Sequence, residues 1–276
     1  MAAKIDRQKV RDSFHRQATD YDRHAVVQRR VVERVVELLQ AEQVAPARLL
    51  DIGAGTGRLL ARLTDRYPEA SAVGVDLAPG MCRTAAANLA GRSVAIRNAD
   101  AEHLPFEAAS FDLVLSTSTY QWLATLDLAF AEAHRVLQPG GLFCFALFGE
   151  RTLFELRDSY QAVLGGGADR SHSFFTNAEV LAALERAGFC APRVHSELEV
   201  ELHLGVPELL RSLKKIGAGS TAPVAAKGLS ERRIMLDMME AYRRNFGRED
   251  GIPASYDVVY GVARKGAPSP PGRGPG

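Results

Sequence analysis

Residues Leu49–Leu59 carry the sequence LLDIGAGTGRL, in which a short apolar run is followed by glycines at every second position. The apolar residues predict a buried β-strand, with Asp51 near its carboxyl end. Gly53, Gly55 and Gly57 predict a sharp turn that comes close to a ligand, because glycine has no Cβ to obstruct the approach. The leucines after the turn have helical spacing, so the segment predicts a strand–loop–helix unit of an α/β protein.

The spacing of these glycines distinguishes between two classes of cofactor. A dinucleotide-binding loop has the pattern G-x-G-x-x-G, so a third glycine is expected at position 58, where the chain has Arg58. This disfavours NAD. An acidic strand end followed by G-x-G-x-G resembles the glycine motif of the class I S-adenosylmethionine-dependent methyltransferases. That cofactor has an ammonium group, which needs an acceptor such as the Asp51 carboxylate or nearby loop carbonyls. The alternative is an ordinary tight turn in another doubly wound fold.

Length and composition exclude several classes of protein. With 276 residues, of which 46% are hydrophobic, the chain can bury one substantial core with an added subdomain. No apolar run is long enough to span a bilayer, and the N-terminus lacks the apolar core of a secretory signal. The three cysteines are scattered, and the histidines lack metal-ligand spacing. We therefore expect a cytoplasmic protein, favoured as a monomer, without a metal, membrane or nucleic-acid partner.

Acidic and polar side chains recur where further strands are expected to end. Asp76 closes an apolar run nineteen residues after Gly57, the place where nucleoside-binding folds have an acid for the ribose hydroxyls. Asp100 follows the next run, where its carboxylate can accept from the adenine amino group and the Ala101 N–H can donate to a ring nitrogen. Ser116 begins a polar and aromatic cluster after the fourth run. Ligands bind at the carboxyl ends of strands in such sheets, so these residues predict one common site.

The expected fold is a Rossmann-like α/β methyltransferase fold: a mostly parallel seven-stranded sheet, helices on both faces, and a helical lid or insertion. Pro139–Gly141 predict a turn before the fifth strand. The chain divides into an N-terminal helical segment over the cofactor pocket (1–40), the core (41–204), a helical insertion (205–248), the last strand (249–265) and a disordered tail (266–276).

Basic residues concentrate in two parts of this chain. Residues 1–34 have nine Lys and Arg against five Asp and Glu, and residues 205–248 have nine against four. The remainder is acidic. These segments are either ordinary solvated faces or a surface for an acidic partner.

Several segments outside the glycine motif resemble one family more narrowly. They are VRDSFHRQATDYDRHAVVQRR (10–30), TYQWL (119–123), LLRSLKKIGA (209–218), YRRNF (242–246) and ASYDVVYG (254–261). With the expected core, they are similar to the malonyl-acyl-carrier-protein O-methyltransferases of biotin synthesis over residues 4–264. The resemblance implies methylation of the free carboxylate of a malonyl thioester on acyl carrier protein, with malonyl-coenzyme A as the alternative carrier. The ester would start the synthesis of the pimeloyl precursor. A glycine-rich loop at Gly165–Gly167 has no functional explanation.

The same resemblance suggests roles for individual residues. Tyr21 is expected to cover the methionine side of the cofactor, and Gln121 and Trp122 to border the reacting carboxylate. That carboxylate is ionised at neutral pH, so in-line positioning, rather than a general base, is expected to carry the reaction. The alternative for Tyr21 and Trp122 is simple core packing.

A cation is also needed to attract the substrate carboxylate. The candidates are Arg16, Arg29, Arg211 and Lys214, among which the sequence does not choose, and the alternative for each is an ordinary surface charge. The residues expected around S-adenosylmethionine, besides Tyr21, are Asp51, Gly53, Ala54, Gly55, Gly57, Asp76, Leu77, Met81, Asp100, Ala101 and Ser116.

Other functions remain open at this point. A methyltransferase for another small carboxylate or for a quinone-type ring would keep the same cofactor site, although a ring hydroxyl would need a general base. An assembly factor of the same fold, without methyl transfer, is disfavoured by the intact acidic and glycine positions. A nucleic-acid methyltransferase is disfavoured because STSTYQWL follows the fourth strand in place of an N/D-P-P-Y/F motif.

Overall fold

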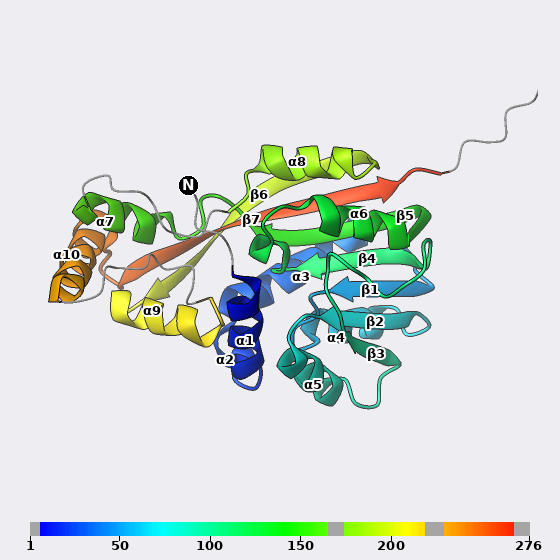
Figure 1. Cartoon of the computed structure of the whole chain (residues 1–276), viewed down its shortest axis with the longest axis horizontal. Coiled ribbons are helices and arrows are strands. Elements are labelled where there is room, and N and C mark those ends of the chain that lie inside the picture. The colour runs from blue at the N-terminus through cyan, green and yellow to red at the C-terminus, as the bar shows by residue number, and fades with distance from the viewer. Residues whose placement is uncertain (1–5, 165–173, 219–228, 268–276) are drawn as a thin grey trace, which may run out of the picture.

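A seven-stranded sheet organises the molecule, with helices on both of its faces (Figure 1). The computed structural model describes residues 6–164, 174–218 and 229–267. Its strands lie in the order β3-β2-β1-β4-β5-β7-β6, with β7 antiparallel to both neighbours and the first five strands parallel. The strands are β1 (Arg48–Ile52), β2 (Ser71–Asp76), β3 (Val94–Asn98), β4 (Phe111–Thr117), β5 (Leu137–Phe148), β6 (Phe189–His203) and β7 (Ile252–Lys265). The predicted fold class is confirmed.

Two apolar layers enclose the sheet because its central strands are buried on both faces. Leu49 of β1 faces the layer of α3 and α4, and Leu50 faces the opposite layer of α6 and α8. The helices are α1 (Arg7–Gln17), α2 (Tyr21–His24), α3 (Val26–Ala41), α4 (Arg58–Arg66), α5 (Pro79–Asn88), η1 (Tyr120–Trp122), α6 (Asp127–Val136), α7 (Phe154–Leu164), α8 (Asn177–Arg186), α9 (Val206–Lys215) and α10 (Leu229–Phe246). No helix within the described ranges is long and apolar enough to span a bilayer.

The turn predicted at Pro139–Gly141 takes the form of an irregularity inside β5. Phe111 of β4 pairs with Leu137, but Leu113 pairs with Leu142, so β5 has extra residues between these pairs. Gly140 adopts a φ of +80° there, a conformation that glycine accepts readily.

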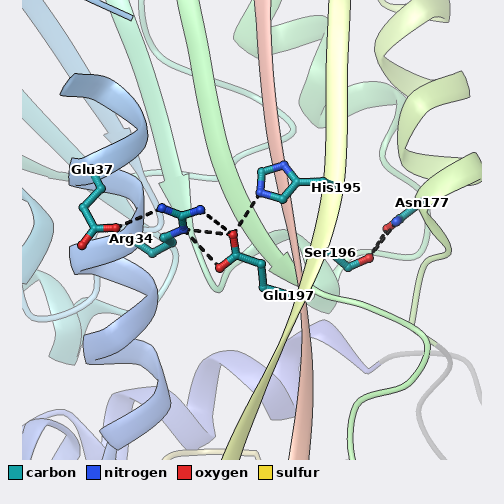
Figure 2. Close-up of polar contacts among 6 residues, drawn as sticks. All are labelled: Arg34, Glu37, Asn177, His195, Ser196 and Glu197. Carbon is teal, nitrogen blue, oxygen red and sulfur yellow. Dashed lines mark hydrogen bonds and ion pairs between the residues drawn. The ribbon is translucent and has the colours of Figure 1, made fainter. Parts of the chain in front are cut away.

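The edge strand β6 is held from two sides by polar contacts (Figure 2). Arg34 of α3 makes a bidentate ion pair with Glu197, at 2.6 Å for its closest contact. Asn177 of α8 and Ser196 exchange hydrogen bonds of 2.7 and 3.0 Å. These contacts fix the long strand β6 to the core before the chain continues into α9.

The segment between β6 and β7 contains α9 and α10, where the sequence predicted a helical insertion. Figure 1 shows α10 beside α7, whereas α9 lies near α1 and α2. The Gly165–Gly167 loop and residues 268–276 of the expected tail lie outside the described residues.

Candidate functional site

The glycine loop joins β1 to α4 in the sharp turn that its sequence predicts, and its glycines adopt the left-handed backbone conformation. Gly53 and Gly57 have φ values of +76° and +85°. A Cβ on Gly53 would lie 2.0 Å from Thr119 Oγ1, and one on Gly57 would lie 2.7 Å from Leu89 Cδ1. A Cβ on Gly55 would instead meet nothing within 4 Å, because this residue lines an open pocket. Two glycines therefore permit close packing, and the third leaves room for a ligand.

Asp76 fixes this loop from the end of β2. Its Oδ2 accepts a 2.9 Å hydrogen bond from the Gly55 N–H, and its Oδ1 accepts one of 2.8 Å from the Ala78 N–H. Burial raises the pKa of Asp76 to about 6, although these two hydrogen bonds lower it in part. The carboxylate lines the pocket and is positioned to accept hydrogen bonds from vicinal hydroxyls of a ligand.

Asp51 is a buried acid without a hydrogen-bonding partner. Only 1% of its surface is exposed, and neither carboxylate oxygen has a partner within the described part of the chain. Burial, and then the charge of Asp76, raise the pKa of Asp51 to about 8. A buried carboxyl group without partners is costly when ionised, and a positively charged ligand nearby would favour the ionised form.

The pocket at these strand ends has about 780 Å³ of empty volume, including the open solvent at its mouth. Most of the expected cofactor residues line it together with one face of α1. The lining residues are Arg7, Val10, Arg11, Phe14, Tyr21, Gly53, Gly55, Val75, Asp76, Leu77, Ala78, Met81, Ala99, Asp100, Ala101, Thr117, Ser118, Thr119, Trp122 and Leu123.

Helix α1 covers this pocket and is tied to its rim. Arg7 pairs with Asp100 at 2.6 Å and also with Glu102, while the Gly80 N–H donates to His15 Nδ1 at 3.1 Å. Sequence reasoning did not identify the α1 residues of the pocket, although the spacing of Arg7, Val10, Arg11 and Phe14 marks one helical face. The ion pairs of Arg7 could not be found in this way, because its partners lie more than ninety residues away.

A second pocket adjoins the first and shares Phe14, Tyr21, Ser118 and Trp122 with it. The Phe14 ring lies edge-on to Trp122, with 5.6 Å between the ring centroids. The remaining described lining residues are Gln28, Gln121, Phe148, Thr152, Leu153, Phe174, Leu213, Ile216, Ala218 and Tyr256. Among the lining residues that the structure describes there is no Asp, Glu, His, Lys or Arg. Burial raises the pKa of Tyr21, which keeps its hydroxyl protonated.

Of the four predicted substrate cations, Arg29 lines a pocket that adjoins the second pocket. It shares this pocket with Tyr21, Gln28 and Ser118, which also line the second pocket. Its Nη1 donates to the Asp22 carbonyl at 2.7 Å, and no carboxylate of the described residues forms an ion pair with it. Arg16, Arg211 and Lys214 are exposed and line none of these pockets.

The other predicted site residues support the loop or border these pockets. Ala54 lines the same pocket as Arg29, and Gln121 lines the second pocket. Ser116 is buried and donates a 2.7 Å hydrogen bond to the Ile52 carbonyl. Asp51, Gly57 and Ser116 line none of these pockets, so their place is behind the glycine loop rather than at the pocket surface.

Comparisons with known proteins identify the class of this site. A family model described as a methyltransferase domain matches residues 50–145. The malonyl-[acyl-carrier protein] O-methyltransferase of Geobacter sulfurreducens is 59% identical over 267 residues, which cover 95% of this chain and 100% of that protein. The protein of the same name from Laribacter hongkongensis is 40% identical, with 96% and 91% covered.

Solved structures of low sequence identity show the same fold. A putative methyltransferase of Bacillus halodurans is 19% identical with a TM-score of 0.59, covering 84% of this chain and 99% of that one. Phosphoethanolamine N-methyltransferase 2 of Haemonchus contortus, solved with S-adenosyl-L-methionine, is 20% identical with a TM-score of 0.53, covering 85% and 52%.

The pocket fits S-adenosylmethionine, the cofactor of this class. The Asp76 carboxylate lines the pocket and can accept hydrogen bonds from vicinal hydroxyls, and the space over Gly55 admits a ligand close to the backbone. Asp51 lies behind the loop without a hydrogen-bonding partner among the described residues, and a ligand with ammonium and sulfonium groups would favour its ionised form. With this cofactor site and with relatives that match over almost its whole length, the chain belongs to the malonyl-[acyl-carrier protein] O-methyltransferase family.

Proposed function

We propose that this chain transfers a methyl group from S-adenosylmethionine to the free carboxylate of a malonyl thioester on acyl carrier protein. The product, a malonyl methyl ester, would start the synthesis of the pimeloyl precursor of biotin. The names of the relatives support this substrate. The observation that carries the proposal is the second pocket, whose described lining is uncharged and which adjoins the cofactor pocket at Phe14, Tyr21 and Trp122.

The pocket lining suits a nucleophile that is already ionised. A malonyl carboxylate has lost its proton at neutral pH, so no side chain has to remove one. S-adenosylmethionine supplies the electrophilic methyl group. Phe14 and Trp122 form an apolar wall where the two pockets meet, which excludes water that would otherwise solvate the carboxylate. Holding the reacting atoms in line can lower the barrier by about 7–11 kcal/mol at best.

Arg29 is our candidate for the cation that attracts the carboxylate. Its guanidinium lines the neighbouring pocket instead of the second pocket itself. From this position the positive charge favours entry of an anion without a tight ion pair that would stabilise the ground state more than the transition state.

The experiment is a methyl-transfer assay with malonyl-acyl carrier protein and methyl-labelled S-adenosylmethionine. We expect the intact carrier protein to gain one methylene in mass, with the label in an ester that alkali releases. Succinyl-acyl carrier protein and malonyl-coenzyme A serve as comparison substrates. Absence of label in the malonyl group, with cofactor binding intact, would contradict the proposal and favour an assembly factor of the same fold.

A quinone-type substrate is less well supported. Its ring hydroxyl would have to lose a proton, and the described lining of the second pocket lacks a histidine or carboxylate to accept it. Faster methylation of a quinol than of the malonyl thioester in the same assay would favour this alternative.

A further inference from the structure

Helix α9 has one face in the second pocket and another in solvent. Leu213 and Ile216, at the end of the helix, form part of the pocket wall. Arg211, Lys214 and Lys215 are exposed on the other side of the helix. A carrier that approached this pocket over α9 would therefore meet three cationic side chains.

These cations, Arg211, Lys214 and Lys215, have no ion-pairing partner among the residues that the structure describes. The acid on the same helix, Glu208, accepts a hydrogen bond of 2.6 Å from the Leu204 N–H near the beginning of the helix. Uncompensated charge of this kind produces a positive potential that attracts an acidic partner.

Most cations of α3 are in a different situation. Arg30 pairs with Glu199 at 3.0 Å and Arg34 pairs with Glu197 at 2.6 Å, so their charges are neutralised within the fold. Figure 2 shows the ion pair of Arg34. Positive residues are common on the whole surface, but those of α9 combine exposure, absence of an ion-pairing partner among the described residues and a place beside the second pocket.

The basic residues of α10 share the exposure but not the position. Arg243 and Arg244 lie in the last turn of this helix. The described residues of α10 line neither the cofactor pocket nor the second pocket, and Figure 1 shows the helix beside α7. The sequence presents residues 205–248 as one basic segment, whereas the structure divides it into a helix at the pocket and a helix away from it.

We infer that the exposed face of α9, formed by Arg211, Lys214 and Lys215, is the docking surface for an acidic face of the carrier domain, and that α10 does not take part. This inference rests on the proposed function, because it assumes a substrate carried by a protein. Charge complementarity at such a surface mainly increases the rate of encounter and is screened by salt, with a Debye length of about 8 Å at physiological ionic strength.

The test compares two double charge reversals of equal size in the full chain. Lys214→Glu with Lys215→Glu is expected to lower kcat/KM for malonyl-acyl carrier protein by roughly tenfold or more at low salt, within the range reported for electrostatic steering. The rate on malonyl-coenzyme A should fall much less. Arg243→Glu with Arg244→Glu, the matched control, should leave both rates near those of the unchanged chain.

Each other outcome would overturn the inference. An equal loss in the two double variants would indicate a general charge effect, and an equal loss on the two substrates would indicate that α9 acts through the pocket. Unchanged rates in the α9 variant would exclude docking there. If the melting temperature of this variant drops, Arg211→Glu provides the same comparison. A chain that methylates neither substrate before any substitution would refute the proposed function itself.

Discussion

At the scale of single residues, Asp76 accepts hydrogen bonds from the Gly55 and Ala78 N–H groups and also lines the cofactor pocket. We expect Asp76→Ala to weaken binding of S-adenosylmethionine and its demethylated product. Each lost hydrogen bond to a charged acceptor is worth about 1.5–3 kcal/mol. Asp112 is a matched control: it accepts hydrogen bonds from the Ala47 and Arg48 N–H groups but lines neither the cofactor pocket nor the second pocket. Calorimetric affinity unchanged in Asp76→Ala, or lost equally in Asp112→Ala, would refute the ribose assignment.

Arg29 provides a second test at this scale. Arg29→Gln removes the charge beside the second pocket, so we expect KM for the malonyl substrate to rise by about tenfold while cofactor affinity stays the same. A single interaction with a charged group is worth about 1.5–3 kcal/mol, and the lower end of this range corresponds to about tenfold. Arg30→Gln is the control, because Arg30 pairs with Glu199 instead. Steady-state kinetics with calorimetry of cofactor binding distinguishes the two roles. An unchanged KM would show that Arg29 is not the cation that attracts the substrate carboxylate.

At the scale of elements, α1 has no fully buried residue and is held over the cofactor pocket by the polar contacts of Arg7 and His15 and by the ring contact of Phe14 with Trp122. Its pairs with Asp100 and Glu102 depend on Arg7. Partly exposed ion pairs contribute up to about 1 kcal/mol each, so Arg7→Met should speed release of the demethylated cofactor by up to about thirtyfold. Arg23→Met is the control, since Arg23 forms a similar pair with Asp20 outside the pocket. Stopped-flow dissociation rates that do not differ would exclude a role for Arg7 in retaining the cofactor.

The elements also show which parts of the site a sequence can predict. The β1 strand was predictable because buried parallel strands are continuous apolar runs. The glycine loop was predictable because only residues without a Cβ allow such a sharp turn and close approach. The acids that end β1 and β2 followed from the same topology. The N-terminal segment was expected over the cofactor pocket, but the α1 residues that line the pocket and the ion pairs of Arg7 were not predicted, because none of the helix is fully buried and the partners of Arg7 are distant in the sequence. The sequence predicted a turn where the structure has an irregularity inside β5. Pro139 and Gly140 give the same local signal for a turn and for an irregular strand.

At the scale of the whole molecule, the stability of the ligand-free chain is linked to its cofactor site through Asp51. Folding raises the pKa of this carboxyl from near 3.9 in the unfolded chain to about 8. Between these values the folded state binds more protons than the unfolded state. The contribution of Asp51 to stability is therefore greatest below the unfolded pKa and is lost as the pH rises toward 8. Asp76, with its pKa raised to about 6, acts in the same direction over a narrower range.

We therefore expect the melting temperature of the ligand-free chain to fall between pH 5 and pH 8 relative to that of Asp51→Asn, whose amide carries no charge to bury. A saturating amount of demethylated cofactor should reduce this difference, because its ammonium group favours the ionised carboxylate. The same linkage predicts that binding at pH 7 releases protons, since a cationic ligand lowers the pKa of Asp51. Calorimetry in buffers of different ionisation enthalpy measures that release, which should disappear in Asp51→Asn. Parallel melting curves for the two proteins across this pH range, together with equal proton release, would show that Asp51 is not the group that couples folding to cofactor binding.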